Sequence, residues 1–326
     1  MTSESCISVD GSATLPGMIS KRTFLRRTAA ALALPAVVPL AGCQSSGSHE
    51  PLWTARPLTQ PGEFTLGIEG PACDRDGNVY AVNYRKEGTI GRTRPDGTSE
   101  VFVELPGKSV GNGIVFDRAG QMFVADYTQH NVLQIDPRTR KISVFAHNPK
   151  MNQPNDLAIA PDGTLFASDP GWKTGDGQLW RIDKDGSTHL LAQGMGTTNG
   201  IEVSPDGSTL YVNESVQRNV WAFTLTPQRT LTNKRLLRKF EDFGFDGMRA
   251  DVDGNLYITR HGAGLVAVVS PQGEVLRTIP VLGSKPSNLC FGGPDGRTIY
   301  VTEVEHTRLV TFRTERPGLA WKRLRS

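Results

Sequence analysis

The sequence lacks an excess of charge of either sign. Its 326 residues include 36 Lys and Arg against 33 Asp and Glu, which gives a formal net charge of +3. Partners with many negative charges, such as nucleic acid or an anionic membrane surface, select proteins with basic patches. No nucleic-acid partner is therefore expected.

Long apolar runs are also missing beyond residue 43, and no later segment is apolar enough to span a bilayer as a helix. Cysteine is scarce, with four residues in the chain. Two of them, Cys73 and Cys290, lie in the predicted folded part. We expect both to be buried thiols, and the alternative is a disulfide between them, which an oxidising compartment would allow.

Residues 1–43 have the features of an export leader, and translation is expected to start at Met18. The run Lys21-Arg22-Thr23-Phe24-Leu25 resembles a twin-arginine signal in which Lys replaces the first Arg, and an apolar stretch follows it. The protein is therefore expected to be exported to the periplasm or cell envelope.

The leader ends in Leu40-Ala41-Gly42-Cys43, which resembles a bacterial lipobox. That motif predicts lipidation of Cys43, with residues 44–56 as a tether, and makes the lipid the only expected contact with a membrane. The alternative is an ordinary secretory signal in which the cysteine occurs by chance.

The rest of the chain repeats one pattern of a polar residue, a short apolar strand and a tight turn. The turn glycines lie 42 to 47 residues apart, at Gly77, Gly120, Gly163, Gly207, Gly254 and Gly296. Repeats of this length predict an all-β fold, a six-bladed β-propeller with four-stranded antiparallel blades over residues 57–326. A β-sandwich or a solenoid is the alternative.

The third repeat shows the expected strands, at residues 157–160, 165–168, 178–183 and 188–192. Helical spacing is absent apart from a possible turn at residues 233–240.

A polar residue stands eight positions before each turn glycine. These residues are Glu69, Asn112, Asn155, Asn199, Asp246 and Asn288. In a propeller they would form a ring at one mouth of a central channel, together with the loops that follow each second strand. Carboxylate and amide oxygens suit hard cations, and the ring contains no Cys or His to indicate structural zinc. The alternative, that Asn and Asp only mark turns, does not explain Glu69.

At these residues the chain resembles the senescence marker protein/gluconolactonase/luciferin-regenerating enzyme family. The motifs are Ile68-Glu69-Gly70-Pro71, Pro154-Asn155-Asp156, Asn199-Gly200 and Phe245-Asp246-Gly247. The resemblance implies a six-bladed propeller with one divalent cation, Ca²⁺ before Zn²⁺, Mn²⁺ or Mg²⁺. It implies Glu69, Asn199 and Asp246 as metal ligands, with Asn155 at the metal or at the substrate.

The resemblance further implies a metal-dependent hydrolase, a lactonase of the gluconolactonase type acting on a small lactone or ester. The cation would polarise the carbonyl group and activate a water molecule, and Asp246 would accept the proton or attack directly. Sugar lactonases of the family often carry Arg just before Asn-Asp, whereas this chain has Asn152-Gln153-Pro154, which argues against a gluconate-like substrate.

Four residues are expected to contact the substrate, namely Asn112, Asn155, Trp172 and His261. Trp172 could instead cover the third blade, and His261 could be a loop contact. The alternative functions are an organophosphate-hydrolysing relative and a non-catalytic propeller that binds a ligand or a protein at the cell envelope. A monomer is expected in each case.

Overall fold

The computed structural model describes residues 51–326. The predicted leader, with Met18, the twin-arginine-like run and Cys43, lies outside these residues. Within the described part, none of the helices combines the length and the apolar character that a membrane crossing requires.

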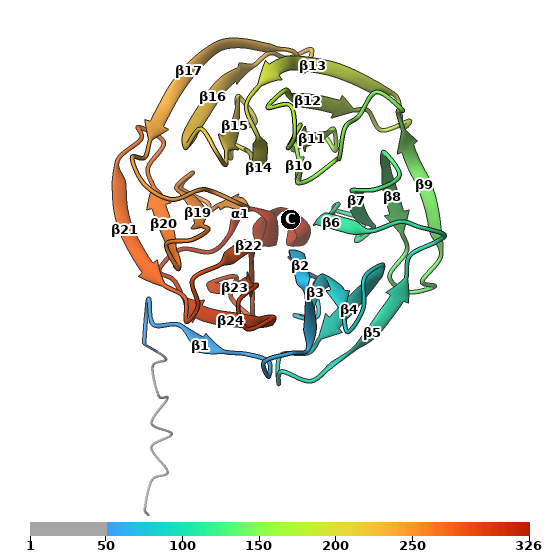
Figure 1. Ribbon diagram of the computed structural model, residues 1–326, viewed down its shortest axis with the longest axis vertical. Helices are drawn as coiled ribbons and strands as arrows, with labels where there is room; N and C mark the ends of the chain where they lie inside the picture. The colour runs from blue at the N-terminus through green and yellow to red at the C-terminus, as the bar shows by residue number, and fades with distance from the viewer. Residues whose placement is uncertain (1–50) are drawn as a thin grey trace, which may run out of the picture. The chain divides into compact units, whose positions relative to one another are not determined.

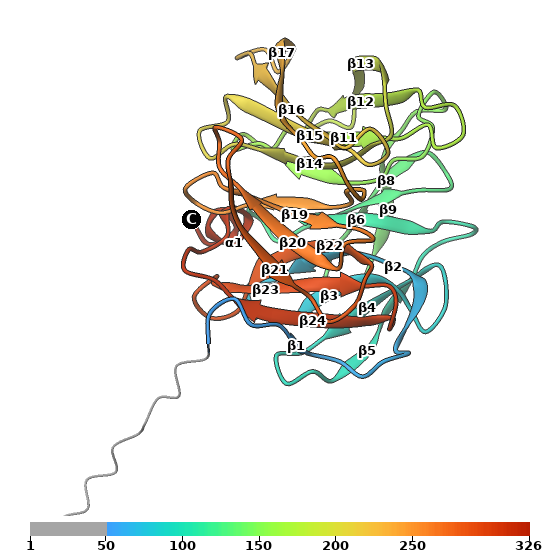
Figure 2. The ribbon, with the colours of Figure 1, turned by 60° about the vertical axis from the view of Figure 1, so that its left-hand side comes forward.

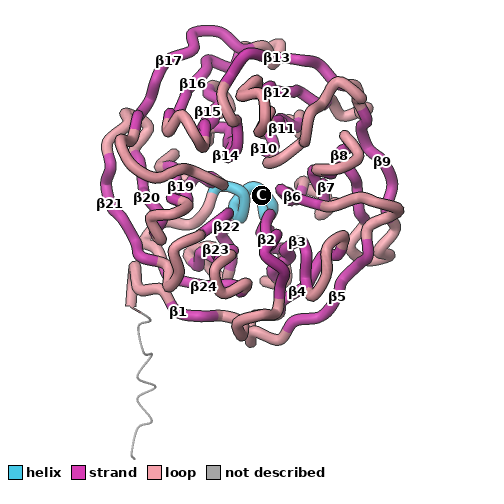
Figure 3. The backbone as a smooth tube through the Cα atoms, in the orientation of Figure 1, coloured by secondary structure: helices cyan, strands magenta, loops and turns pink. Residues whose placement is uncertain are grey.

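Six four-stranded antiparallel sheets are arranged as blades around a common axis (Figure 1). In five blades the four strands follow one another in chain order, and the first of them lies nearest the axis (Figure 1). The predicted six-bladed β-propeller is therefore confirmed. The tube view shows strands in every blade, joined by loops, and a helix at the centre (Figure 3).

The first three blades have the strands β2 (Phe64–Cys73), β3 (Val79–Tyr84), β4 (Thr89–Thr93), β5 (Ser99–Glu104); β6 (Gly111–Phe116), β7 (Met122–Asp126), β8 (Asn131–Ile135), β9 (Ile142–His147); and β10 (Leu157–Ile159), β11 (Leu165–Asp169), β12 (Gly177–Ile182), β13 (Thr188–Met195). The fourth and fifth blades have β14 (Thr198–Val203), β15 (Thr209–Glu214), β16 (Asn219–Leu225), β17 (Leu231–Lys239); and β18 (Met248–Ala250), β19 (Leu256–Arg260), β20 (Leu265–Val269), β21 (Val275–Pro280).

The sixth blade joins the beginning of the described chain to its end. Its strands are β22 (Pro286–Gly292), β23 (Thr298–Glu303), β24 (Arg308–Arg313) and, as the outermost strand, β1 (Arg56–Pro57). Trp53 donates its backbone N–H to Arg313 O at 2.9 Å and packs against the apolar core of this blade. Residues 51–56 fall in the segment that the sequence predicts as a tether, and within it Leu52 and Arg56 pair with Arg313 and Thr311 of β24, which covers an otherwise open strand edge.

A helix forms at the C-terminal end, α1 (Leu319–Arg325), and it lies at the centre of the ring on one face (Figures 1 and 2). The sequence did not predict this helix. The helical turn expected at residues 233–240 is wrong, since most of that segment is strand β17, which pairs with β16. Register and edge pairing decided the conformation of this polar segment, and its local composition did not.

Neighbouring blades pack face to face through apolar side chains. All six residues of β3 are buried, because its blade lies between two others. One cluster joins Tyr80 of the first blade to Ile114 and Met122 of the second. Cys73 and Cys290 are buried free thiols in the cluster between the first and last blades, as expected.

The tight turns after the inner strands are stabilised locally. Asp162 Oδ1 accepts the Thr164 N–H at 3.0 Å, and Gly163 donates to Ala160 O at 3.0 Å. Gly163 has a φ of 92°, a conformation that glycine adopts without steric cost. We call the end of the channel with these turns the turn end, and the opposite end the ring end.

Helix α1 covers the turn end. The Arg323 guanidinium donates to Ile159 O at 2.9 Å and to Ser204 O at 2.8 Å, just before the turns of the third and fourth blades. Arg75 Nε donates to Leu324 O at 2.8 Å from the first blade. The helix is therefore held by three blades at once, and ligands can reach the channel more directly from the ring end.

Candidate active site

The predicted ring lies at one end of the channel. Five of its members line a single pocket of about 340 Å³, namely Glu69, Asn112, Asn155, Asn199 and Asp246. The sixth, Asn288, is buried and uses its Oδ1 to accept the Leu289 N–H at 2.8 Å. The fixed offset within each repeat therefore brings together side chains that are up to 177 residues apart in the sequence.

Glycine follows four ring residues because the next blade leaves no room for a side chain. A Cβ on each glycine would meet Asn112 O at 1.9 Å from Gly70, Asp156 Oδ1 at 2.6 Å from Gly113, Asp246 O at 2.7 Å from Gly200 and Asn288 Oδ1 at 2.0 Å from Gly247. Gly113 and Gly200 lie inside strands β6 and β14. At these two positions, close packing between blades explains the Asn-Gly pairs, and the turn interpretation is wrong.

Backbone hydrogen bonds between blades fix the ring. Gly113 N donates to Asn155 O at 2.8 Å, and Gly200 N donates to Asp246 O at 3.0 Å. Asn155 and Asp246 are thus each positioned by the blade that precedes them. Their side chains therefore extend into the pocket from backbone that is fixed by hydrogen bonds.

The surroundings of the two ring carboxylates disfavour their ionised forms. Burial raises the pKa of Glu69 to about 7, the charge of Asp156 raises it further, and a hydrogen bond from Gly70 N at 2.8 Å opposes the shift. Burial also raises the pKa of Asp246 well above its usual value, and the neighbouring Glu69 adds to the effect. Two acidic groups side by side in a buried site favour the binding of a cation.

Two amide oxygens of the ring have no hydrogen-bond partner among the described residues. They are Asn112 Oδ1 and Asn199 Oδ1, and both are buried. Asn199 Nδ2 donates to Ser215 Oγ at 3.0 Å, which leaves its oxygen as the group available to a ligand. A buried oxygen without a donor is costly, and a hard cation would satisfy it. The residues present therefore fit a divalent cation with oxygen ligands.

A third carboxylate lies below the ring, and it is fully paired. Arg249 binds Asp156 through two contacts, Nη1 to Oδ2 at 2.7 Å and Nη2 to Oδ1 at 2.8 Å, and both side chains are buried. The charge of Glu202 also acts on Arg249. Sequence reasoning missed Arg249, although a charged residue inside the inner strand β18 is a usable signal, because such residues are seldom buried without a partner.

The pocket continues outward to an apolar rim. Trp172, from the loop between β11 and β12, lines it together with Tyr127, Leu66, Val110 and Val304. His261 also lines the pocket, and burial lowers its pKa, with a smaller contribution from the charge of Lys285. The residues expected to contact substrate therefore share one pocket with the expected metal ligands, and their individual roles stay predictions.

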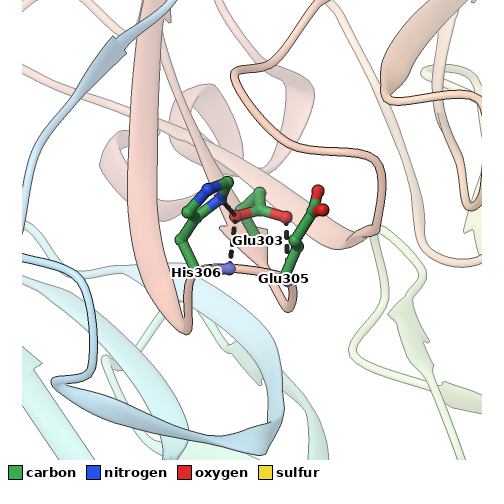
Figure 4. A group of neighbouring side chains, drawn as sticks. All are labelled: Glu303, Glu305 and His306. Carbon is green, nitrogen blue, oxygen red and sulfur yellow. Dashed lines mark hydrogen bonds and ion pairs between the residues drawn. The ribbon is translucent and has the colours of Figure 1, made fainter.

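A second group of possible ligands lies nearby but is already satisfied. Glu303, at the end of β23, lies together with Glu305 and His306 of the following loop (Figure 4). The buried Glu303 carboxylate accepts hydrogen bonds from Glu305 N, His306 N and His306 Nδ1, each at 2.9 Å. Its oxygens therefore hold a loop in place, as those of Asp126 do after β7, and the group does not line the pocket.

The chain is similar to proteins of one known family. Residues 53–305 match the family model described as the SMP-30/Gluconolactonase/LRE-like region. The chain is 28% identical to the gluconolactonase of Zymomonas mobilis over 283 residues, which are 75% of this chain and 79% of that protein. It is 29% identical to a pentonolactonase of Haloferax volcanii over 239 residues, 72% of this chain and 80% of the relative.

A third relative has a different activity. The diisopropyl-fluorophosphatase of Loligo vulgaris is 28% identical over 293 residues, 80% of this chain and 93% of the relative. Among solved structures, a calcium-binding regucalcin of Agrobacterium tumefaciens superposes with a TM-score of 0.69 at 22% identity, over 78% of this chain and 92% of that chain. At that identity the structural likeness supports the fold alone.

Proposed function

The chain belongs to the SMP-30/gluconolactonase/LRE-like family, and on this premise we propose that its ring-end pocket hydrolyses a small lactone with one divalent cation bound. The observation that carries the proposal is the convergence of two carboxylates of raised pKa and two unpartnered amide oxygens in one pocket. Two relatives that share most of their length with the chain are lactonases.

The cation would be held by Glu69, Asn155, Asn199 and Asp246. All four offer oxygen, which favours Ca²⁺, with Mn²⁺, Mg²⁺ and Zn²⁺ as the alternatives. When bound, the cation would polarise the lactone carbonyl and lower the pKa of a water molecule. Asn112, whose Oδ1 is unpartnered, would orient the substrate beside it.

Asp246 would accept the proton that the attacking water loses. Its carboxylate lies among the ring oxygens, and its backbone is fixed by the hydrogen bond from Gly200 N to Asp246 O at 3.0 Å. A positioned carboxylate of raised basicity is suited to this role at neutral pH. His261 is next in line as proton acceptor, since it lines the same pocket and its lowered pKa keeps it neutral.

The test is a substrate panel. The purified protein, stripped of metal and reloaded with Ca²⁺, Mn²⁺ or Zn²⁺, is assayed on sugar and alkyl lactones, carboxylic esters and diisopropyl fluorophosphate. Metal-dependent turnover of lactones supports the proposal. Turnover of the fluorophosphate alone would assign the organophosphatase activity, which the relative from Loligo vulgaris motivates. Absence of turnover on every compound would leave a binding propeller.

We also propose export and lipid anchoring, because the leader ends in Leu40-Ala41-Gly42-Cys43. Cys43→Ala should move the protein out of the membrane fraction and abolish labelling by a fatty-acid analogue. Unchanged fractionation and labelling would contradict the lipobox.

A further inference from the structure

The pocket has two zones with opposite chemistry. Its floor carries the ring carboxylates and amides, whereas its rim is formed by Leu66, Val110, Tyr127, Trp172 and Val304. Leu66 is 75% exposed and Trp172 is 40% exposed. Large apolar side chains in the open are ordinary when they are scattered, but at the entrance of a polar pocket they provide a surface for an apolar ligand.

The pocket offers no cationic side chain to an anionic substrate. Among the described residues that line it, none is Lys or Arg, while Glu69, Glu87 and Asp246 are acidic. His261 has its pKa lowered by burial, and Lys285, whose charge adds to that shift, is exposed and does not line the pocket. Even with a divalent cation on the ring, a carboxylate, sulfonate or phosphate on the substrate would find no cationic side chain in the pocket and would meet the acidic Glu87.

The polar groups of the rim interact with one another. Burial raises the pKa of the half-buried Tyr127, and side-chain hydrogen bonds with Gln153 and Trp172 oppose that shift. Leu66, Val110, Trp172 and Val304 line this part of the pocket together with Tyr127, so its surface is mainly aromatic and aliphatic. A polyhydroxylated substrate would lose hydrogen bonds to water here without equivalent replacements.

We propose that the substrate is an uncharged lactone with an apolar alkyl or aryl substituent, which lies on the rim of Trp172, Leu66 and Tyr127 while the lactone carbonyl reaches the ring. This inference rests on the proposed lactonase function. It adds what that function leaves open, namely that the selectivity of the pocket comes from apolar contact outside the ring.

The test is a series of γ-lactones that differ only in an unbranched side chain, from γ-butyrolactone to γ-decalactone. D-glucono-1,5-lactone and a carboxylated γ-lactone serve as polar and anionic comparisons. Each methylene that reaches the rim should raise kcat/KM up to about fourfold, mostly through a lower KM. A preference for the sugar lactone or the anionic lactone, or no dependence on chain length, would overturn the inference while leaving the lactonase function intact.

Variants locate the effect. Trp172→Ala and Leu66→Ser should each reduce the slope of log(kcat/KM) against chain length. Leu236→Ser is the matched control, since Leu236 is 48% exposed on β17 and does not line the pocket, and it should leave the slope unchanged. Equal slopes in all three variants and the unaltered protein would contradict an apolar rim.

A binding measurement separates this inference from the proposed function. Calorimetry with unreactive 2-alkylcyclopentanones should show at least tenfold tighter binding of the hexyl than of the methyl compound, and Trp172→Ala should diminish the difference. If binding depends on chain length in this way but no lactone is turned over, the proposed function is contradicted and the apolar rim is supported. If lactones are turned over but binding does not depend on chain length, the apolar rim is contradicted and the proposed function is supported.

Discussion

Aspartate side chains at the two ends of the channel have pKa values shifted in opposite directions. At the turn end, Asp206 accepts hydrogen bonds from Ser204 Oγ at 2.6 Å and Ser208 N at 3.0 Å, which hold its pKa below the usual value. At the ring end, burial beside Glu69 raises the pKa of Asp246 well above the usual value. The fold stabilises the ionised carboxylate of Asp206 and disfavours that of Asp246.

The difference indicates that polar groups at the turn end stabilise the fold, whereas polar groups at the ring end are available for binding and chemistry. The repeat supplies a polar residue at both ends of each inner strand. The turn end gives these residues local donors, whereas the ring end gathers them from different blades without enough donors. Unsatisfied groups in a rigid, otherwise satisfied frame are typical of functional sites.

The largest expected effect comes from removing a charge at the ring end. Asp246→Asn keeps an oxygen of similar size but removes a basic group, so kcat should fall about 10²- to 10⁴-fold even at saturating metal. Glu69→Gln also weakens metal binding, but excess metal should restore part of its rate if Glu69 is only a ligand. The measurement is kcat against metal concentration for both variants.

Thermal unfolding of the same variants provides the control, because both should fold if the blades carry the core. Equal recovery of the two variants at high metal would show that Asp246 is a ligand and not the base. The proton acceptor would then be sought at His261, which lines the same pocket.

The next effect concerns the paired carboxylate below the ring. Arg249→Met should lower the free energy of unfolding by about 3 to 5 kcal/mol, because it leaves Asp156 buried without its cation. The double variant Asp156→Asn with Arg249→Met should recover much of this loss. Urea unfolding monitored by fluorescence checks both, and a stable Arg249→Met protein would contradict the assigned pairing.

A smaller effect is expected at the turn end. Arg323→Met removes the donors to Ile159 O and Ser204 O and should cost about 2 kcal/mol of unfolding free energy. Lys322→Met is the matched control on the same helix, since Lys322 is exposed, and it should change stability little. If the two variants are equally stable, α1 is not held through Arg323.

The smallest effect tests a single turn carboxylate. Hydrogen bonds from Arg313 lower the pKa of Asp295 from 3.8 to about 2, but the Asp295 side chain is 41% exposed, so the pair should contribute less than about 1 kcal/mol. A carboxyl group whose pKa is lower in the folded state than in the unfolded state stabilises the protein at pH values above the unfolded-state pKa. The contribution should therefore be lost as the pH falls from 3.8 towards 2.

Unfolding free energies of Asp295→Asn and the unaltered protein, compared from pH 6 downward, check this prediction. Their difference should shrink as the pH falls; a difference that stays constant or grows would show that folding does not lower the pKa of Asp295.

The structural features that recur in every repeat could be predicted from the sequence, and those that occur only once could not. Six blades and the ring follow from a fixed offset between polar residues and turn glycines, and the strands of the third blade lie within three residues of their predicted bounds. β1 and α1 could not be foreseen, because two residues at a sheet edge and seven residues after Gly318 acquire their conformations through distant contacts. Arg249 was missed for the same reason, since its partner Asp156 is on another blade.

The pairing of β1 with β24 also bears on how the protein folds. Arg56 aligns with Thr311, so the sixth blade needs segments from both extremes of the described chain. The other five blades are built from strands that follow one another directly, and each requires only short loops to close. Contacts between distant segments cost more chain entropy and form more slowly than local ones. A nascent chain can therefore shape five blades as it emerges, but the ring has no closed circumference until β24 is available.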